Sequence, residues 1–226
     1  METELKLRFV QPDGQADFMA SPWLHQLVMP DSTTKTEMLS RYYDTASHEL
    51  TRLKTSLRIR TEGDARTVTI KLGGQASNGL HQRLEWSVLI DEDEWEDDLD
   101  SGLNIDWFFR HAESDGDPDE RLHEILQVLE GQPLQEICQA RFTRTAFDVG
   151  FGDTLMELAL DNGEIQAGSL TDSINELELE LKEGDVRDLM ELGSLLMDRY
   201  ELVPESKSKY ARCLDLLNQQ ANAGHD

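Results

Sequence analysis

The sequence predicts an α+β protein built around an eight-stranded antiparallel β-barrel, with a charged lumen and with helices packed on the outside. Two observations carry this prediction. Charged and apolar residues alternate with a period of two in one segment after another, as side chains do along a β-strand. Several connecting segments carry apolar residues at helical spacing, which indicates amphipathic helices that need an apolar surface to cover.

The first expected strand, residues 2–8, shows the alternation clearly. Glu2, Glu4 and Lys6 lie on one face of an extended chain, and leucines lie on the other. Taken alone, such a strand is typical of a sheet edge whose polar face meets water. The same alternation, with both signs of charge, returns in residues 57–62, 67–72 and 81–89, whose polar faces carry Arg58, Arg60, Lys71, Arg83 and Glu85.

The second half of the chain resumes this pattern. Residues 154–161 place Glu157 and Asp161 on one face, and residues 174–182 alternate leucines with Glu176, Glu178, Glu180 and Lys182. Residues 37–44 and 135–149 are two further, less regular strands. Arg141 and Arg144 in the last of these have opposite parity, so a regular strand directs only one of them to the charged face.

The connecting segments predict helices near residues 18–28, 119–130 and 184–200, and a final helix that carries Leu214, Leu216 and Leu217. An acidic connection is expected at about residues 91–120. With 226 residues, the chain has ample material for one large domain, and we assign residues 1–226 to a single domain.

Composition excludes several classes of protein. The formal net charge of −25 argues against nucleic acid as a partner, because such binding draws on a positive surface. The sequence has no apolar run near the roughly 18 residues of a membrane span and no signal-peptide pattern, which makes a cytoplasmic location the expectation. Cys138 and Cys213 lie far apart in the sequence and in no metal-binding spacing, so we expect neither a disulfide bond nor a zinc site.

The charged faces can be oriented in two ways. If helices cover the apolar faces of a closed barrel, the charged side chains point into an enclosed lumen. In the alternative, an open sheet has its apolar face under the helices and its charged face in water, and the pattern alone does not exclude it. A closed lumen would hold both acidic residues, namely Glu2, Glu4, Glu157, Asp161, Glu178 and Glu180, and basic residues, namely Lys6, Arg58, Arg60, Lys71, Arg83 and Lys182.

Such a lumen has a definite chemistry. Clustered carboxylates repel one another unless cations are supplied, and hard oxygen ligands suit Mg²⁺ or Mn²⁺. The basic side chains in turn need an anion, and the arginine guanidinium is well matched to phosphate. Basic groups together with carboxylates that can hold a metal therefore indicate a site for a polyphosphate.

The motifs also resemble those of a known family. The opening ETELK matches the Glu-x-Glu-x-Lys signature of the CYTH family, or triphosphate tunnel metalloenzymes, and YYDT, LRIR, HQRLEW, ELELELKEG and SKSKYAR follow in the family's order. The resemblance covers nearly the whole chain and is greatest to bacterial inorganic triphosphatases. It implies a tunnel in which a water activated by Mg²⁺ or Mn²⁺ hydrolyses triphosphate to pyrophosphate and orthophosphate.

The resemblance also implies roles for individual residues. The metal would be held by Glu2, Glu4, Asp161, Glu178 and Glu180. The phosphates would be bound by Lys6, Arg58, Arg60, Lys71, Arg83, Arg144 and Lys207, with Arg144 favoured over Arg141. Catalysis would rest on Glu4, Lys6, Arg58 and Glu180.

Other functions stay open at this level. The family includes class IV adenylate cyclases and thiamine triphosphatases, and the lumen residues alone do not separate these activities. A non-catalytic polyphosphate-binding module and a structural interaction module are further alternatives. The expected partner is a small molecule that carries a triphosphate, without nucleic acid or membrane, and the oligomeric state is open, with a homodimer as one option.

Overall fold

The computed structural model describes residues 2–73, 75–91, 102–112 and 120–223. Its strands are β1 (Glu2–Phe9), β2 (Thr34–Thr45), β3 (Thr55–Glu62), β4 (Ala65–Leu72), β5 (Gln75–Ser77), β6 (Leu80–Arg83), β7 (Glu85–Leu89), β8 (Leu134–Phe151), β9 (Thr154–Ala167), β10 (Leu170–Glu183) and β11 (Leu202–Pro204). Its helices are α1 (Gly14–Met19), α2 (Leu24–Leu27), α3 (Glu49–Arg52), α4 (Ile105–His111), α5 (Glu120–Leu129), α6 (Val186–Arg199) and α7 (Lys209–Ala223).

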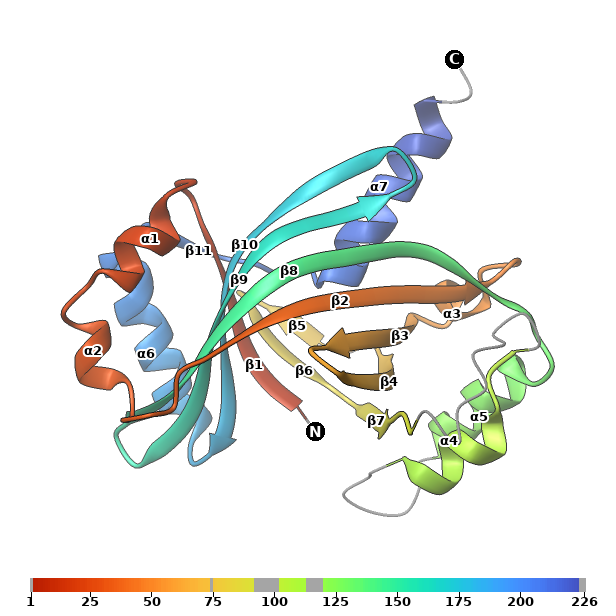
Figure 1. Cartoon of the computed structure of the whole chain (residues 1–226), viewed down its shortest axis with the longest axis horizontal. Coiled ribbons are helices and arrows are strands. Elements are labelled where there is room, and N and C mark those ends of the chain that lie inside the picture. Colours follow the sequence, from red (N-terminus) through yellow and green to blue (C-terminus); the bar gives the residue numbers. More distant parts are fainter. Residues whose placement is uncertain (1, 74, 92–101, 113–119, 224–226) are drawn as a thin grey trace.

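The strands form one antiparallel sheet that curls into a half-barrel (Figure 1). Its order is β5-β6-β1-β10-β9-β8-β2-β3-β4-β7, and β11 pairs with β1. Residues 80–89 form β6 and β7 with a break at Leu84; β6 pairs with β1 while β7 pairs with β4, so this segment bonds to both ends of the curled sheet. If β6 and β7 are counted as one interrupted strand, the sheet has eight principal strands. The predicted antiparallel barrel-like fold is therefore confirmed.

Two apolar clusters on the outer face of the sheet explain the helical connections. Leu5 and Leu7 of β1 are fully buried against α6, together with Phe18 of α1 and Leu24 of α2. On the other side, the apolar face of β3, β4 and β7 packs under α3, α4 and α5. The charged face is therefore turned inward, where Glu4, Lys6 and Arg58 are each less than a tenth exposed. This burial rules out the open sheet with a solvated charged face.

Helix α7 packs differently from the other helices. Its Cys213 and Leu216 contact Phe142 of β8, Ile165 of β9 and Ile174 of β10. These three strand residues have the same parity as the charged residues farther along their own strands, so they belong to the inner face. One end of the inner face is thus apolar, and α7 covers it.

The two cysteines meet in this apolar region. A disulfide bond joins Cys138 of β8 to Cys213 of α7 across a sequence separation of 75 residues. The expectation that neither cysteine forms a disulfide was therefore wrong. Spacing along the chain contained no signal for the bond, because the two residues approach only when α7 folds back onto the sheet.

The remaining segments can be compared with their predictions. The expected strand 37–44 lies within β2, and the expected helix 119–130 corresponds to α5. Within the acidic connection, the structure describes α4, whereas residues 92–101 and 113–119 lie outside the described residues. None of the helices in the described part of the chain is long and apolar enough to cross a bilayer.

Candidate functional site

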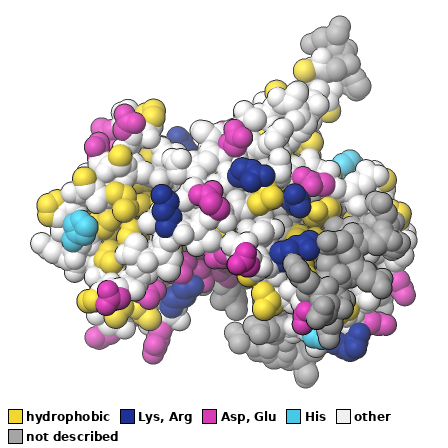
Figure 2. All heavy atoms as spheres, in the orientation of Figure 1, with side chains coloured by type: hydrophobic (Ala, Val, Ile, Leu, Met, Phe, Trp, Pro, Cys, Tyr) yellow, Lys and Arg dark blue, Asp and Glu magenta, His cyan; other side chains and the backbone are white. Residues whose placement is uncertain are grey.

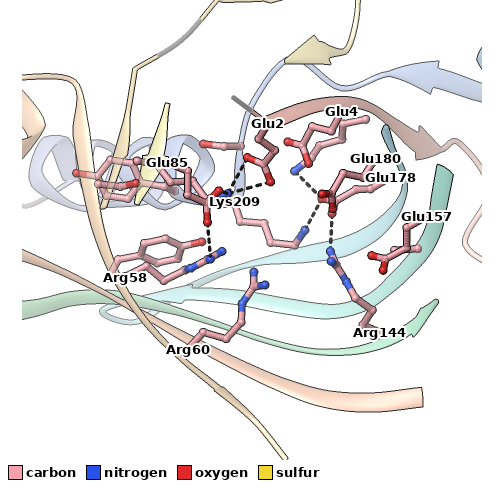
Figure 3. A pocket seen from close by; sticks show the side chains of 17 residues that line it. Glu2, Glu4, Arg58, Arg60, Glu85, Arg144, Glu157, Glu178, Glu180 and Lys209 are labelled. Atoms are coloured by element: carbon pink, nitrogen blue, oxygen red, sulfur yellow. Dashed lines mark hydrogen bonds and ion pairs between the residues drawn. The ribbon is translucent and has the colours of Figure 1, made fainter. Parts of the chain in front are cut away.

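A pocket of about 380 Å³ opens on the inner face of the sheet (Figure 3). The strands that surround it present side chains of both charges to the same space, as the alternation predicts. Nine of the predicted site residues line it, namely Glu2, Glu4, Lys6, Arg58, Arg60, Lys71, Arg144, Glu178 and Glu180. Side chains from segments distant in the sequence, among them β1, β3, β4, β8 and β10, are therefore brought together.

Four other residues of the sequence analysis lie elsewhere or are only partly described. Asp161 is fully buried and is absent from the pocket wall, and Arg141 is exposed. Lys207 is exposed as well, with its Nζ 2.6 Å from Asp215 Oδ2, so it does not close the pocket as expected. Arg83 lies opposite Glu2 in the β6–β1 register, but its side chain is outside the described residues.

Strand register builds an acidic wall on one side of the pocket, which we define as Glu4, Glu157 and Glu180. Glu4 of β1 is directly opposite Glu180 of β10, and Glu180 is directly opposite Glu157 of β9. Directly opposed side chains in antiparallel strands are close neighbours. Burial raises the pKa of Glu180, and Glu2 and Glu157 add to the rise, although Lys182 Nζ at 3.0 Å opposes it.

Three arginines face this wall. Figure 3 shows Arg58, Arg60 and Arg144 directed into the space opposite the glutamates. Arg60 Nε donates a hydrogen bond to Ser40 Oγ at 3.2 Å. Burial lowers the pKa of Arg60 to about 10, and the positive charges of Arg58 and Arg144 contribute. The buried Nε of Arg58 has no hydrogen-bond partner among the described residues.

The third side of the pocket is a lysine between two glutamates. Lys71 Nζ lies 2.9 Å from Glu2 Oε2 and 2.5 Å from Glu85 Oε2. Burial alone would raise the pKa of Glu85, but the charges of Lys71 and Arg58 lower it to about 2. Lys71 is thus already neutralised, whereas the guanidiniums of Arg58 and Arg60 retain hydrogen-bonding capacity for an anion.

The floor of the pocket is a buried ion cluster, which we define as Asp161, Glu176, Glu178, Lys6 and Lys209. Glu178, Lys6 and Lys209 line the pocket, whereas Asp161 and Glu176 are fully buried beneath it. Lys209 Nζ lies 2.7 Å from Asp161 Oδ2, 2.8 Å from Glu176 Oε2 and 2.9 Å from Glu178 Oε1. Lys6 Nζ lies 2.9 Å from Glu178 Oε1. Despite the opposing effect of burial, these contacts raise the pKa of Lys209 well above its ordinary value and lower that of Glu178 well below its own.

Lys209 is the site residue that the sequence analysis missed. Its side chain occupies the position that was expected for the side chain of Lys207. Lys207 comes two residues earlier in the same SKSK segment. The signal was helical periodicity: Lys209, Arg212, Cys213 and Leu216 recur at the spacing of one helix face, and all four are buried on α7. Lys207 precedes the helix and lies off this face.

The donor set suits a hard divalent cation. Glu4, Glu157 and Glu180 offer carboxylate oxygens from three adjacent strands, without sulfur or imidazole ligands, as Mg²⁺ or Mn²⁺ prefers. The carboxylates of Asp161, Glu176 and Glu178 form a second group, whose ligand oxygens lie within 4.8 Å of one another. That second group already surrounds the ammonium of Lys209, so the acidic wall is the better fit.

Comparison with known proteins agrees with this architecture. The inorganic triphosphatase of Haemophilus influenzae is 33% identical over 171 residues, which cover 76% of this chain and 43% of that protein. The match thus spans less than half the length of this relative.

Two solved structures have the same fold. A putative adenylyl cyclase from Hippeastrum, described as having a dominant triphosphatase activity, superposes with a TM-score of 0.67 at 18% identity, covering 95% of this chain and 96% of that one. A putative adenylate cyclase from Bacillus halodurans gives a TM-score of 0.54 at 17% identity, covering 92% and 97%. The model of the CYTH domain matches residues 1–214, and the chain therefore belongs to the CYTH family.

Proposed function

We propose that this protein is a divalent-metal-dependent triphosphatase that hydrolyses inorganic triphosphate to pyrophosphate and orthophosphate. The observation that carries the proposal is the set of three arginines, one buried and two half-buried, opposite an acidic wall. Burial lowers the pKa of Arg60 to about 10 and the charges of Arg58 and Arg144 contribute, so an anion beside Arg60 would offset its charge. A chain of phosphates supplies several anionic oxygens to guanidiniums that are arranged in this way.

The family relationship supports the same chemistry. The relative from Haemophilus influenzae is named an inorganic triphosphatase, and the Hippeastrum protein is described by a triphosphatase activity. Each is a statement about that protein. Its transfer to this chain is supported by the presence of both halves of a triphosphatase site, namely the arginines for phosphate and the carboxylates for a metal.

The side chains divide the work of the proposed reaction. Arg58, Arg60 and Arg144 hold the phosphate oxygens and stabilise the charge that develops on the leaving pyrophosphate. Glu4 and Glu180, with Glu2 beside them, would hold Mg²⁺ or Mn²⁺, which supplies charge neutralisation and a polarised water. Glu157 is placed to accept the proton of the attacking water at a carboxylate oxygen, because it neighbours Glu180 across the strands.

The direct test is orthophosphate release from tripolyphosphate, ATP and thiamine triphosphate, each with Mg²⁺, Mn²⁺ or EDTA. We expect tripolyphosphate to be the preferred substrate and EDTA to abolish turnover. Formation of cyclic AMP from ATP would instead assign a cyclase, and preference for thiamine triphosphate would assign the corresponding phosphatase. Tight binding of tripolyphosphate without any turnover would identify the protein as a non-catalytic binding module.

A first prediction concerns the arginine that carries the proposal. Arg60→Met removes a charge-assisted contact worth about 1.5–3 kcal/mol, so kcat/KM for tripolyphosphate should fall about 10–100-fold. The matched control is Arg141→Met, which removes an exposed arginine. Steady-state kinetics of both variants give the comparison, and equal kcat/KM values for the two would contradict the assigned role of Arg60.

A further inference from the structure

The buried ion cluster contains an acidic group whose centre is already filled. Asp161, Glu176 and Glu178 each contribute an oxygen, and these oxygens lie within 4.8 Å of one another, a spacing that one metal ion could bridge. The position between them is taken by Lys209 Nζ, at 2.7–2.9 Å from all three residues. We propose that Lys209 acts as a built-in cation that keeps divalent metal out of this group and thereby confines metal to the acidic wall.

The first support is that the carboxylates have no coordination capacity to spare. Asp161 accepts two hydrogen bonds of 2.8 Å from Arg144 in addition to the one from Lys209. Glu176 accepts one of 2.6 Å from Arg212 Nη1, and Glu178 is held by Lys6 and Arg144. A metal ion would have to displace charged donors from all three residues at once.

The second support is the balance of charge. The three carboxylates face four cationic side chains, namely Lys6, Lys209, Arg144 and Arg212. Arg212 also binds Asp172, with its Nη2 2.6 Å from Oδ2, which brings the set to four charges of each sign. The cluster therefore has no net negative charge that would attract a dication.

Glu180 and Glu157 of the acidic wall are paired less closely with cations. Glu180 and Glu157 share Lys182, whose Nζ lies 3.0 Å from the first and 3.8 Å from the second. The side chain of Lys182 is 38% exposed, so water screens its charge. Because Glu180 lies directly opposite both Glu4 and Glu157 and its lysine partner is partly solvated, a divalent cation there would relieve repulsion among these carboxylates.

The third support is that α7 holds the ammonium in place. Lys209 is the first residue of this helix, and Tyr210 next to it has its hydroxyl 2.9 Å from Thr51 Oγ1. One turn farther on, Cys213 is bonded to Cys138 of β8. Lys209 therefore enters the cluster from a helix that is fixed to the sheet, unlike Lys207, which lies at the surface.

The inference concerns metal binding alone and is tested without substrate. The number of Mn²⁺ ions bound per chain is measured by titration calorimetry and by electron paramagnetic resonance of free Mn²⁺, for the unaltered protein, for Lys209→Met and for Lys207→Met. Lys209→Met removes the internal cation with a side chain of similar length, so we expect one additional Mn²⁺ per chain. Lys207→Met should bind the same number as the unaltered protein.

A folded Lys209→Met variant that binds no additional Mn²⁺ would overturn the inference. A second measurement does not depend on the folding of that variant: anomalous diffraction from crystals of the unaltered protein soaked in Mn²⁺. We expect no peak between Asp161, Glu176 and Glu178, and a peak there would also overturn the inference. If the unaltered protein binds no Mn²⁺ but the variant binds one, Lys209 excludes metal as inferred, whereas both the binding of metal at the acidic wall and the role of metal in the proposed reaction are overturned.

Discussion

At the scale of single residues, the pocket separates groups that are neutralised from groups that are not. Lys71 and Glu85 form a close pair, and the pKa of Glu85 is lowered to about 2. Arg60 and Glu180 show the opposite behaviour, since burial disfavours the ionised form of each, and neighbouring charges of the same sign contribute to both pKa shifts. A triphosphate anion bridged to the acidic wall by a divalent cation would compensate both of these groups.

A prediction at this scale concerns Glu4. Glu4→Gln removes one carboxylate opposite Glu180, so the loss of repulsion should keep the change in the free energy of unfolding within about 1 kcal/mol. Turnover should nevertheless fall by more than about 100-fold, because loss of a supporting residue alone can cost that much at a metal site. Phosphate release and urea denaturation measure the two effects, with Glu164→Gln on the exposed part of β9 as the control.

A near-normal rate for Glu4→Gln would show that the metal is held elsewhere. The converse result, a large loss of stability together with the loss of activity, would mean that Glu4 has a structural role and that its part in turnover has to be reassigned.

Sequence alone placed most of these residues on the correct face, because strand parity determines which side of a sheet a side chain occupies. Parity does not determine where along its strand a charged side chain lies or how deeply that side chain is buried. Asp161 shares its face with Glu157, yet it lies beneath the pocket under Arg144 and Lys209. The family resemblance favoured Arg144 over Arg141, and the observed register, in which Arg144 lies opposite Asp161, assigns Arg144 to the inner face.

At the scale of secondary-structure elements, α7 was the least predictable part of the fold. Its apolar pattern indicated a helix, but the other helices cover the outer face of the sheet, and nothing in the pattern marks α7 as a helix for the inner face. Which of Lys207 and Lys209 reaches the site depends on the residue at which α7 begins and on which side of this helix is buried. Both are set by tertiary packing, in which the Cys138–Cys213 bond takes part.

The disulfide gives a prediction for this element. Cys213→Ala, or reduction with dithiothreitol, should lower the free energy of unfolding by about 2–4 kcal/mol, because the bond closes a long loop in the unfolded chain. Urea denaturation with and without dithiothreitol provides the measurement. Dithiothreitol should have no further effect on Cys213→Ala, and an unchanged midpoint for the fully reduced unaltered protein would contradict the prediction.

At the scale of the whole molecule, the protein has a formal net charge of −25. The pocket is nevertheless lined in part by arginine and lysine side chains. On the face shown in Figure 2, Lys and Arg side chains of the described residues are scattered among Asp and Glu. The pocket lining brings six basic side chains together, with six glutamates beside them. The acidic exterior contributes self-repulsion, which weakens as the pH falls toward the sequence pI of about 4.4.

The pH dependence of stability follows from the buried glutamates. Burial alone would raise the pKa of Glu176, but Lys209 and Lys6 lower it to about 2. Because this folded-state pKa lies below the ordinary value of 4.5, the stabilisation is complete above pH 4.5 and is lost as the pH falls toward 2. The loss amounts to roughly 3 kcal/mol for this group, and Glu85 adds a loss of the same sign.

Urea denaturation at pH 6, 4.5 and 3 would show this loss as a falling free energy of unfolding below pH 4.5. Glu180 works in the opposite direction, since its raised pKa favours the folded state as it becomes protonated. Glu176→Gln should be less stable at pH 6 and should lose less on acidification. If the free energy of unfolding stays constant between pH 4.5 and 3, the assignment of Glu176 and Glu85 as ionised glutamates paired with cations is wrong.

The pairing of β1 with β10 has a consequence for biosynthesis. Glu4 meets Glu180, and Lys6 meets Glu178, across strands that come from opposite ends of the chain. A nascent polypeptide leaving the ribosome therefore carries its first strand without this neighbour until translation has passed Glu180. Metal and phosphate ligands converge only after Glu180 has been synthesised, so ion binding by this pocket would report that β10 has paired with β1 and that the barrel has closed.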